Sequence, residues 1–317
     1  MNENKVKSDK FAALRYRDFR LLWIGLFITN IGSQMQFAAI NWHMFILTHS
    51  AASLGLIGLS RFVPIAIFSL IGGAVADAHN RKKILFITQT LLTFLSFVLA
   101  ISTFNHTVTP LIIYIVTALS ATILAFDSPP RQAIIPTLVH KSHLSNAISL
   151  TSIMFQSSMI IGLALSGFII GQFGVGVIYF INGFSFISVI GALLFMKTSG
   201  EIEGEPSRVT LKAVWEGLVF VRSKTIVWTT MLLDFFSTLF SSATSLLPIF
   251  AQNLQIGPVG FGFLYAAPSI GAMTAGYIMA HKGNIKNQGK VLLGSITIYG
   301  LSTIMFGLSK FFPLSLL

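Results

Sequence analysis

The sequence predicts an all-α protein that crosses a membrane many times, and three observations support this prediction. Of its 317 residues, 54% are hydrophobic and only 10% are charged, whereas a soluble protein carries about 25% charged residues. Apolar runs of about 20 residues, long enough for a helix to cross the hydrocarbon core of a bilayer, recur along the chain. The basic residues between these runs gather in alternate connections.

The apolar runs predict nine membrane-spanning helices. They lie near residues 21–45, 53–76, 84–104, 109–126, 144–170, 174–196, 226–250, 258–280 and 289–309. The first run is too long for the core of a secretory signal peptide and is followed by no small-residue cleavage site. We therefore interpret it as the first spanning helix.

The distribution of positive charge predicts the orientation of these helices. Of the 21 Lys and Arg residues, 19 lie in the N-terminal tail or in the connections after the second, fourth, sixth and eighth expected helices. The exceptions are Arg61, inside the second helix, and Lys310, just after the ninth. By the positive-inside rule the N-terminus is cytoplasmic and the protein lies in the plasma (inner) membrane. The net charge of +11 thus reflects topology, and no basic face with interleaved aromatic residues is present to bind nucleic acid.

An internal repeat links the second part of the chain to the first. An offset of 204 positions aligns Gly58 with Gly262, Pro64 with Pro268, Gly72 with Gly276, Ala76 with Ala280, and Lys82 with Lys286. Glycine and proline determine helix packing and kinks, so matches of this kind indicate related helices. Parallel repeated halves of six helices are a known transporter architecture.

The repeat predicts the organisation of the chain. A cytoplasmic tail (1–20) precedes a six-helix half (21–197), a cytoplasmic linker (198–225) and the first three helices of a second half (226–317). Because the first half has six helices, the last three helices of the second half are expected to be missing. A protein ending at Leu317 is accordingly expected not to complete a transport cycle alone.

The connection after the second expected helix is a candidate gate. Gly72 and Gly73 allow another helix to approach closely. Asp77 lies near the carboxyl end of its helix, where the helix dipole disfavours an anion, and nearby cations are expected to neutralise it. Asn80 can turn the chain in a left-handed conformation. This segment is either a latch or a basic turn that only sets topology; its residues are Gly72, Gly73, Asp77, Asn80, Arg81, Lys82 and Lys83.

These residues resemble the loop signature of the major facilitator superfamily, Gly-x-x-x-Asp-x-x-Gly-Arg-basic-basic, between helices 2 and 3. The segments Phe11–Trp23 and Ser128–Pro136 are similar to segments of the branch that contains macrolide efflux pumps and the enterobactin exporter. The resemblance implies a major facilitator fold of two pseudo-repeated six-helix halves. It also implies a drug:proton antiporter, in which the segment of Asp77 latches the two halves in one access state.

Some residues depart from the family pattern. Asn80 replaces the usual glycine, and residues 110–126 lack the arginine that efflux families often place in helix 4. The antiporter signature Gly-Pro-x-x-Gly-Gly of helix 5 occurs as Gly162-Leu-Ala-Leu-Ser166-Gly167, without the proline. Its small residues, together with Gly276 in the eighth helix, still predict close helix packing. These departures weaken the prediction of proton-coupled antiport more than that of transport.

Polar residues inside the expected helices are candidates for the transport mechanism, because charges in hydrocarbon are costly unless functional or paired. Asp234 is either a proton-coupling carboxylate or a structural one. Arg61 either gates a cavity or extends to the membrane surface. A polar face on the first helix and a shorter one on the fifth line a cavity or bond to other helices. The residues of these faces are Asn30, Gln34, Phe37 and Asn41, and Ser149, Ser152 and Gln156.

The sequence therefore predicts a secondary transporter that exports a small amphipathic organic molecule, such as a drug-like compound or a siderophore. We expect no cofactor, and we expect the proton gradient to supply the energy. A lipid or metabolite transporter or flippase of the same fold, and a non-transporting receptor or sensor, remain as alternatives. An enzyme is not expected, since the chain lacks cysteine, His-Glu-x-x-His and Gly-x-Ser-x-Gly. The pair His140 and His143 is interpreted as solvated rather than as metal ligands.

Overall fold

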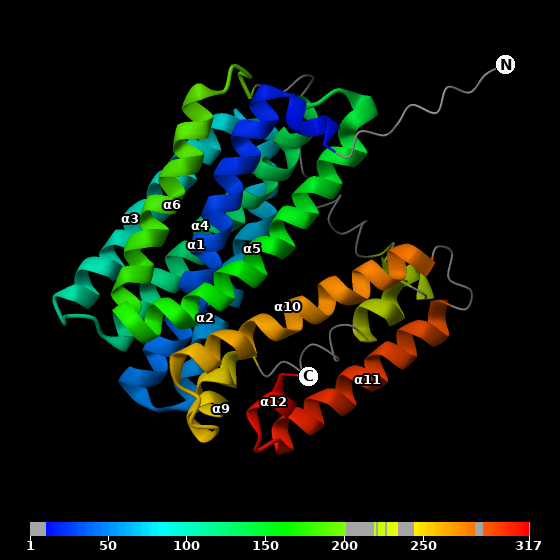
Figure 1. The fold of residues 1–317 in the computed structure, drawn as a ribbon. Coiled ribbons are helices and arrows are strands. Elements are labelled where there is room, and N and C mark those ends of the chain that lie inside the picture. The colour runs from blue at the N-terminus through cyan, green and yellow to red at the C-terminus, as the bar shows by residue number, and fades with distance from the viewer. Residues whose placement is uncertain are drawn as a thin grey trace.

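The computed structural model describes residues 11–200, 219, 221–225, 227–233, 244–282 and 288–316. Within these residues the regular structure is helical and no strand forms, as predicted (Figure 1). The first six long helices are α1 (Arg17–Thr48), α2 (Ala51–Ala78), α3 (Arg81–Phe104), α4 (Pro110–Leu138), α5 (Leu144–Phe173) and α6 (Val175–Phe195). The later helices are α9 (Leu247–Asn253), α10 (Gly257–Lys282), α11 (Gln288–Leu308) and α12 (Phe312–Ser315).

Short side chains begin several of these helices. The side chains of Ser50, Asn80 and Thr109 accept hydrogen bonds from backbone amides three residues later, so each satisfies an amide left free at a helix start. At the end of α5, Gly174 adopts φ +79°, which favours glycine and allows α6 to begin at once.

Helix α4 is longer than the sequence predicted. The expected span ended at residue 126, three residues before Pro129, and proline is unfavourable inside a helix. The structure instead carries α4 through Pro129, Pro130 and Pro136 to Leu138. Pro129 has no N–H to donate to the carbonyl of Ala125, four residues earlier. That carbonyl lies against Gly72 of α2. Helix α2 therefore packs closely against α4 at the point where α4 lacks this backbone hydrogen bond.

Helices α1 to α6 form one bundle. Helix α1 packs against α5 and α6, α2 packs against α4, and α3 packs against α4 and α6 (Figure 1). Six helices of the described chain are long and apolar enough to cross a membrane: α2, α3, α4, α5, α6 and α11. Helix α1 is not among them. It has the required length, but it carries Asn30, Gln34, Gln36 and Asn41, and most of this polar surface faces the protein interior.

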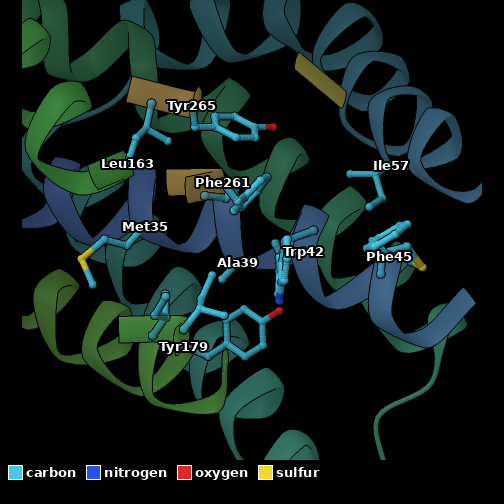
Figure 2. Packing of buried hydrophobic residues seen from close by; sticks show 14 of the residues in the cluster. Met35, Ala39, Trp42, Phe45, Ile57, Leu163, Tyr179, Phe261 and Tyr265 are labelled. Carbon is cyan, nitrogen blue, oxygen red and sulfur yellow. The ribbon is translucent and has the colours of Figure 1, made fainter. Parts of the chain in front are cut away.

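Helix α10 joins the bundle along α5. A methyl group built on Gly167 of α5 would lie 2.8 Å from the Cα atom of Gly262 on α10, so the two backbones are in contact there. The same helix places two aromatic rings against α1 (Figure 2). Phe261 lies 4.9 Å from Trp42, and Tyr265 lies 5.8 Å from Phe37, measured between ring centroids.

The helix bounds agree with the sequence repeat. Adding 204 to the last residue numbers of α2 and α3, 78 and 104, gives 282 and 308, where α10 and α11 end. Pro64 and its counterpart Pro268 both lie inside their helices. Most of the linker 198–225 lies outside the described residues, as do residues 226 and 234–243 of the helix expected at 226–250. At the end of that expected helix, the structure has a short turn at Thr244–Leu246 followed by α9.

Gly72→Ala is expected to lower the free energy of unfolding by about 1–3 kcal/mol, because the new methyl group would meet the carbonyl of Ala125. The matched control is Gly73→Ala in the same helix, where a methyl group would meet no atom within 4 Å. Denaturation of the two variants in detergent would measure the difference. Equal losses of stability in both variants would contradict the packing described for α2 and α4.

Candidate functional site

A cavity of about 90 Å³ lies among α1, α2, α3, α4 and α6. Its wall combines apolar side chains with a few polar ones. The lining residues of α1 and α2 are Ser33, Gln36, Phe37, Ile40, Ile57 and Arg61. Those of α3, α4 and α6 are Leu92, Ser96, Thr117, Ser120, Ala121, Leu124, Asn182 and Phe186. An apolar wall with a small number of placed polar groups is typical of sites for small organic molecules.

One side of this wall is a hydrogen-bonded cluster that joins three helices. The Oε1 atom of Gln36 accepts hydrogen bonds from Ser96 Oγ at 3.0 Å and from Asn182 Nδ2 at 2.9 Å. These three residues, from α1, α3 and α6, are each less than 9% exposed. Ser185 Oγ donates to Asn182 Oδ1 at 2.9 Å. Because these groups bond to one another, they hold this side of the cavity in place.

The wall also carries Arg61, the only charged residue that lines the cavity within the described part of the chain. Its guanidinium lies over the ring of Phe37, 4.6 Å from the centroid, and the ring of Phe37 contacts that of Tyr265 edge-on, with 5.8 Å between the centroids. The ion pairs found among the described residues join Arg17 to Asp18 and Arg131 to Asp127, and neither includes Arg61. The guanidinium thus packs on the ring of Phe37 and has no carboxylate partner among the described residues.

The cavity face of α1 differs from the polar face expected from the sequence. Phe37 lines the cavity, but Asn30, Gln34 and Asn41 do not. Gln34 lies beside Gly162 of α5, and Asn41 donates to the carbonyl of Phe37 within its own helix. The wall uses Gln36 instead. A helix turns about 100° per residue, so Gln34 and Gln36 face nearly opposite sides of α1, and periodicity alone did not distinguish them.

The remaining candidates lie away from the cavity. Gln156 is exposed on α5, and Gly276 of α10 has open space beside it. Gly162 and Gly167 lie where α5 packs against α1 and α10. Buried Ser166 donates a hydrogen bond to Leu163 of its own helix. Asp234 lies outside the described residues.

The segment between α2 and α3 is hydrogen-bonded to residues at the ends of other helices. Asn80 does not adopt the expected left-handed conformation; its φ is −57°, and its side chain caps α3. Its amide group also donates to the carbonyl of Ser199 at 2.9 Å. The backbone N–H of Arg81 donates to Gly200 at 3.0 Å, and Lys82 Nζ donates to the carbonyl of Met196 at 2.7 Å.

The cations of this segment lie at the carboxyl ends of two helices. The Arg81 guanidinium donates to the carbonyl of Ala133 in the last turns of α4, at 3.0 Å. Lys82 reaches the residue that follows α6. Both positions are where a helix dipole favours positive charge. Asp77 lies partly buried in the last turn of α2.

A second set of hydrogen bonds joins helix ends at the same end of the bundle. The carboxylate of Asp18, which precedes the expected spanning run of α1, accepts hydrogen bonds from the amide of Thr198 at 2.8 Å and from its hydroxyl at 2.7 Å. Partial burial favours the protonated acid, but these hydrogen bonds outweigh it and hold the pKa of Asp18 below its ordinary value of 3.8. The carboxylate is therefore charged at neutral pH and joins the start of α1 to the end of α6.

The structure also contains a buried acidic centre that the sequence analysis missed. Asp127 of α4 is fully buried and forms an ion pair with Arg131 one turn later. Its Oδ1 atom accepts hydrogen bonds from Thr88 Oγ1 at 2.6 Å and from Gln89 Nε2 at 2.9 Å, both on α3. The expected end of this helix at residue 126 placed Asp127 and Arg131 in a solvated loop. Their spacing of four residues was the available signal.

Comparisons with known proteins identify the relatives of this chain. A family model described as transmembrane secretion effector matches residues 8–316. The staphyloferrin A transporter of Staphylococcus aureus is 28% identical over 296 residues, covering 91% of this chain and 70% of that protein. Macrolide efflux protein A of Streptococcus pyogenes is 22% identical, covering 92% and 73%. The enterobactin exporter of Shigella boydii is 25% identical, covering 92% and 70%.

Asp127→Asn is expected to lower the free energy of unfolding by about 1.5–3 kcal/mol, the usual range for hydrogen bonds to a charged group. The substitution removes the charge that Arg131 pairs with. Two threonine substitutions on α3 distinguish the loss of these hydrogen bonds from non-specific destabilisation. Thr88→Val removes one hydrogen bond to Asp127 and should also destabilise, whereas Thr90→Val changes an exposed residue that bonds only within its own helix and should not. Thermal unfolding in detergent would measure all three, and an Asp127→Asn protein as stable as the wild type would contradict the role given to this centre.

Proposed function

The chain belongs to the major facilitator superfamily, and we propose that it exports a small amphipathic organic molecule by alternating access, driven by exchange for protons. A drug-like compound or a siderophore fits this description. The match to the transmembrane secretion effector family over residues 8–316 supports transport as the function. The names of the relatives, which concern a macrolide, staphyloferrin A and enterobactin, favour export of organic molecules of moderate size.

The observation that carries this proposal is the cavity itself. Its polar groups come from α1, α3, α4 and α6, and Arg61 comes from α2. Polar and ionisable groups inside a membrane bundle are costly, so they are retained where they meet a substrate or an ion. The apolar remainder of the wall suits an amphipathic molecule.

The contact between α5 and α10 supports the proposed alternation. Gly167 and Gly262 meet backbone to backbone, so no long side chains interlock at this point. Helices joined in this way can slide or rock against each other at small cost, as alternating access requires. In this proposal the residues of the first half move as one body, and α10 moves with the second half.

We propose that segment 72–83 is the latch of this cycle and that it faces the cytoplasm. The contacts of Asn80, Arg81 and Lys82 bind the segment to the ends of α4 and α6. Asp77 in the last turn of α2 is the group that would meet the second half in one access state. Arg131, in the later part of α4, lies at the same end of the bundle as segment 72–83.

Topology can be tested directly because the chain contains no cysteine. With the N-terminus in the cytoplasm, Lys141→Cys should react with a membrane-impermeant maleimide only after cells are permeabilised. His106→Cys, in the connection at the opposite end of the bundle, should react in intact cells. Both positions are exposed, so a difference in labelling reports sidedness. Labelling of Lys141→Cys in intact cells would contradict the proposed orientation.

Transport can be tested in everted membrane vesicles from cells that make the protein at its natural length. Energised vesicles should accumulate at least one member of a panel of macrolides, siderophores and amphipathic dyes, and a protonophore should abolish the accumulation. Gln36→Leu should weaken transport several-fold, because it leaves Ser96 and Asn182 without their shared acceptor. Ser149→Ala, an exposed change on α5, is the control. Absence of protonophore-sensitive accumulation across the panel, with the protein present and folded, would reject proton-coupled export.

A further inference from the structure

Arg61 is a permanent cation at an unusual place. It is the eleventh residue of the 28-residue helix α2, so it lies well away from both ends of a helix that is long and apolar enough to cross a membrane. Arginine does not lose its proton in proteins. A charge at this depth is costly unless it has a partner or a function.

The protein contacts of Arg61 occupy one part of the guanidinium and leave another part available. The ring of Phe37 covers a face of the planar group at 4.6 Å. A cation–π contact of this kind orients the plane but uses none of the five N–H donors, which lie in the plane of the group. Among the hydrogen bonds of the described residues, none is donated by Arg61. A planar fork of free donors is the arrangement that binds carboxylate in a bidentate manner.

Two buried hydroxyl groups near Arg61 are also unused. The Oγ1 atom of Thr117 is buried and has no hydrogen-bond partner, although its residue lines the same cavity and is only 7% exposed. The hydroxyl of Tyr265 is likewise buried and without a partner, and the ring of Tyr265 contacts Phe37, the residue on which Arg61 packs. Buried polar atoms nearly always have a partner. Two unpartnered hydroxyl donors near one cation point to a missing acceptor.

Of the other polar residues of the wall, Gln36, Ser96 and Asn182 are already occupied, whereas Ser33 and Ser120 also line it and no side-chain hydrogen bond of theirs is found among the described residues. Gln36, Ser96 and Asn182 bond to one another. The rest of the wall near Arg61 is formed by apolar side chains such as Ile57 and Leu124. A ligand that satisfies this cavity therefore carries one anionic, hydrogen-bond-accepting group at the Arg61 side and an apolar body elsewhere.

We propose that Arg61, Thr117 and Tyr265 form a site for the carboxylate group of the transported molecule, so that the substrate class is an amphipathic organic carboxylate. The guanidinium supplies charge and direction, and the two hydroxyl groups donate to the carboxylate oxygens. This inference rests on the proposed transport function, since it names the chemical class that the cavity selects. It also explains why an arginine lies inside α2 without a carboxylate partner among the described residues.

The test uses two probes that differ only in charge, 2-naphthoate and 2-naphthamide, with the purified full chain in detergent. Binding is followed by probe fluorescence. Wild-type protein should bind the carboxylate at least about tenfold more tightly than the amide, as expected for a charge-assisted hydrogen bond. Arg61→Gln should remove this preference while amide binding stays within about twofold. Arg61→Lys should keep part of the preference, because it retains charge but not the planar fork.

Further variants separate the site from general charge effects. Thr117→Val should reduce carboxylate binding several-fold and leave amide binding unchanged. Lys310→Gln removes an exposed cation that does not line the cavity and should change neither. Equal binding of the two probes to the wild type, or a preference that survives Arg61→Gln, would overturn the proposal. Displacement of naphthoate by dioctanoyl phosphatidate, but by no soluble carboxylate, would also overturn it, since the site would then hold a lipid headgroup.

These results are independent of the transport assay. Loss of charge preference with intact proton-driven export of neutral dyes would reject the carboxylate site and leave the exporter function standing. Carboxylate-selective binding that depends on Arg61, with no flux of any molecule in the panel, would instead reject export and retain the site.

Discussion

The structure depends on the lack of hydrogen-bonding partners in the hydrocarbon of a bilayer. A polar side chain inside this bundle must form hydrogen bonds with another part of the protein, because lipid tails contain no hydrogen-bonding groups. Gln36, Ser96 and Asn182 satisfy this requirement by joining α1, α3 and α6. Asp127 satisfies it with Thr88, Gln89 and Arg131, and so joins α3 to α4. Six buried polar atoms of the described residues have no hydrogen-bond partner, and Thr117 Oγ1 and the hydroxyl of Tyr265 are the two that the proposed carboxylate site would satisfy.

The close helix contacts follow from the same setting. Between helices in lipid there is little hydrophobic driving force, so small residues and tight packing replace it. Gly72 lies against the α4 carbonyl that Pro129 leaves without a helical hydrogen bond, and Gly162 lies against α1. Gly167 meets Gly262 where α5 adjoins α10. The contacts of Gly72 and Gly162 bring together helices of the α1–α6 bundle, and the polar clusters then select which side of each helix faces inward.

Much of the fold could be predicted from the sequence because lipid imposes strong and regular patterns. Length and hydrophobicity located α1, α2, α3, α5, α6, α10 and α11 to within a few residues, but not α9, which begins near the end of the helix expected at 226–250. The expected end of α4 at residue 126 was also wrong, because the helix continues through three prolines, and Gly72 packs against the carbonyl of Ala125 in that region. The same error hid Asp127. The inward face of α1 was harder to predict, because Gln34 and Gln36 are chemically identical and lie on opposite sides. Which glutamine faces the cavity depends on the neighbouring helices. Gly162 lies beside Gln34, whereas Ser96 and Asn182 bond to Gln36.

The attachment of Asn80, Arg81 and Lys82 to residues 196–200 has a mechanical consequence. Four hydrogen bonds connect the turn between α2 and α3 to the stretch of chain that leaves α6, and Asp18 anchors that stretch to the start of α1. A pull on the chain beyond residue 200 is therefore transmitted to the turn and to α1 together. The end of α6 therefore has a fixed point of attachment at residues 196–200, through which a displacement reaches α1 and the turn before α3 at the same time.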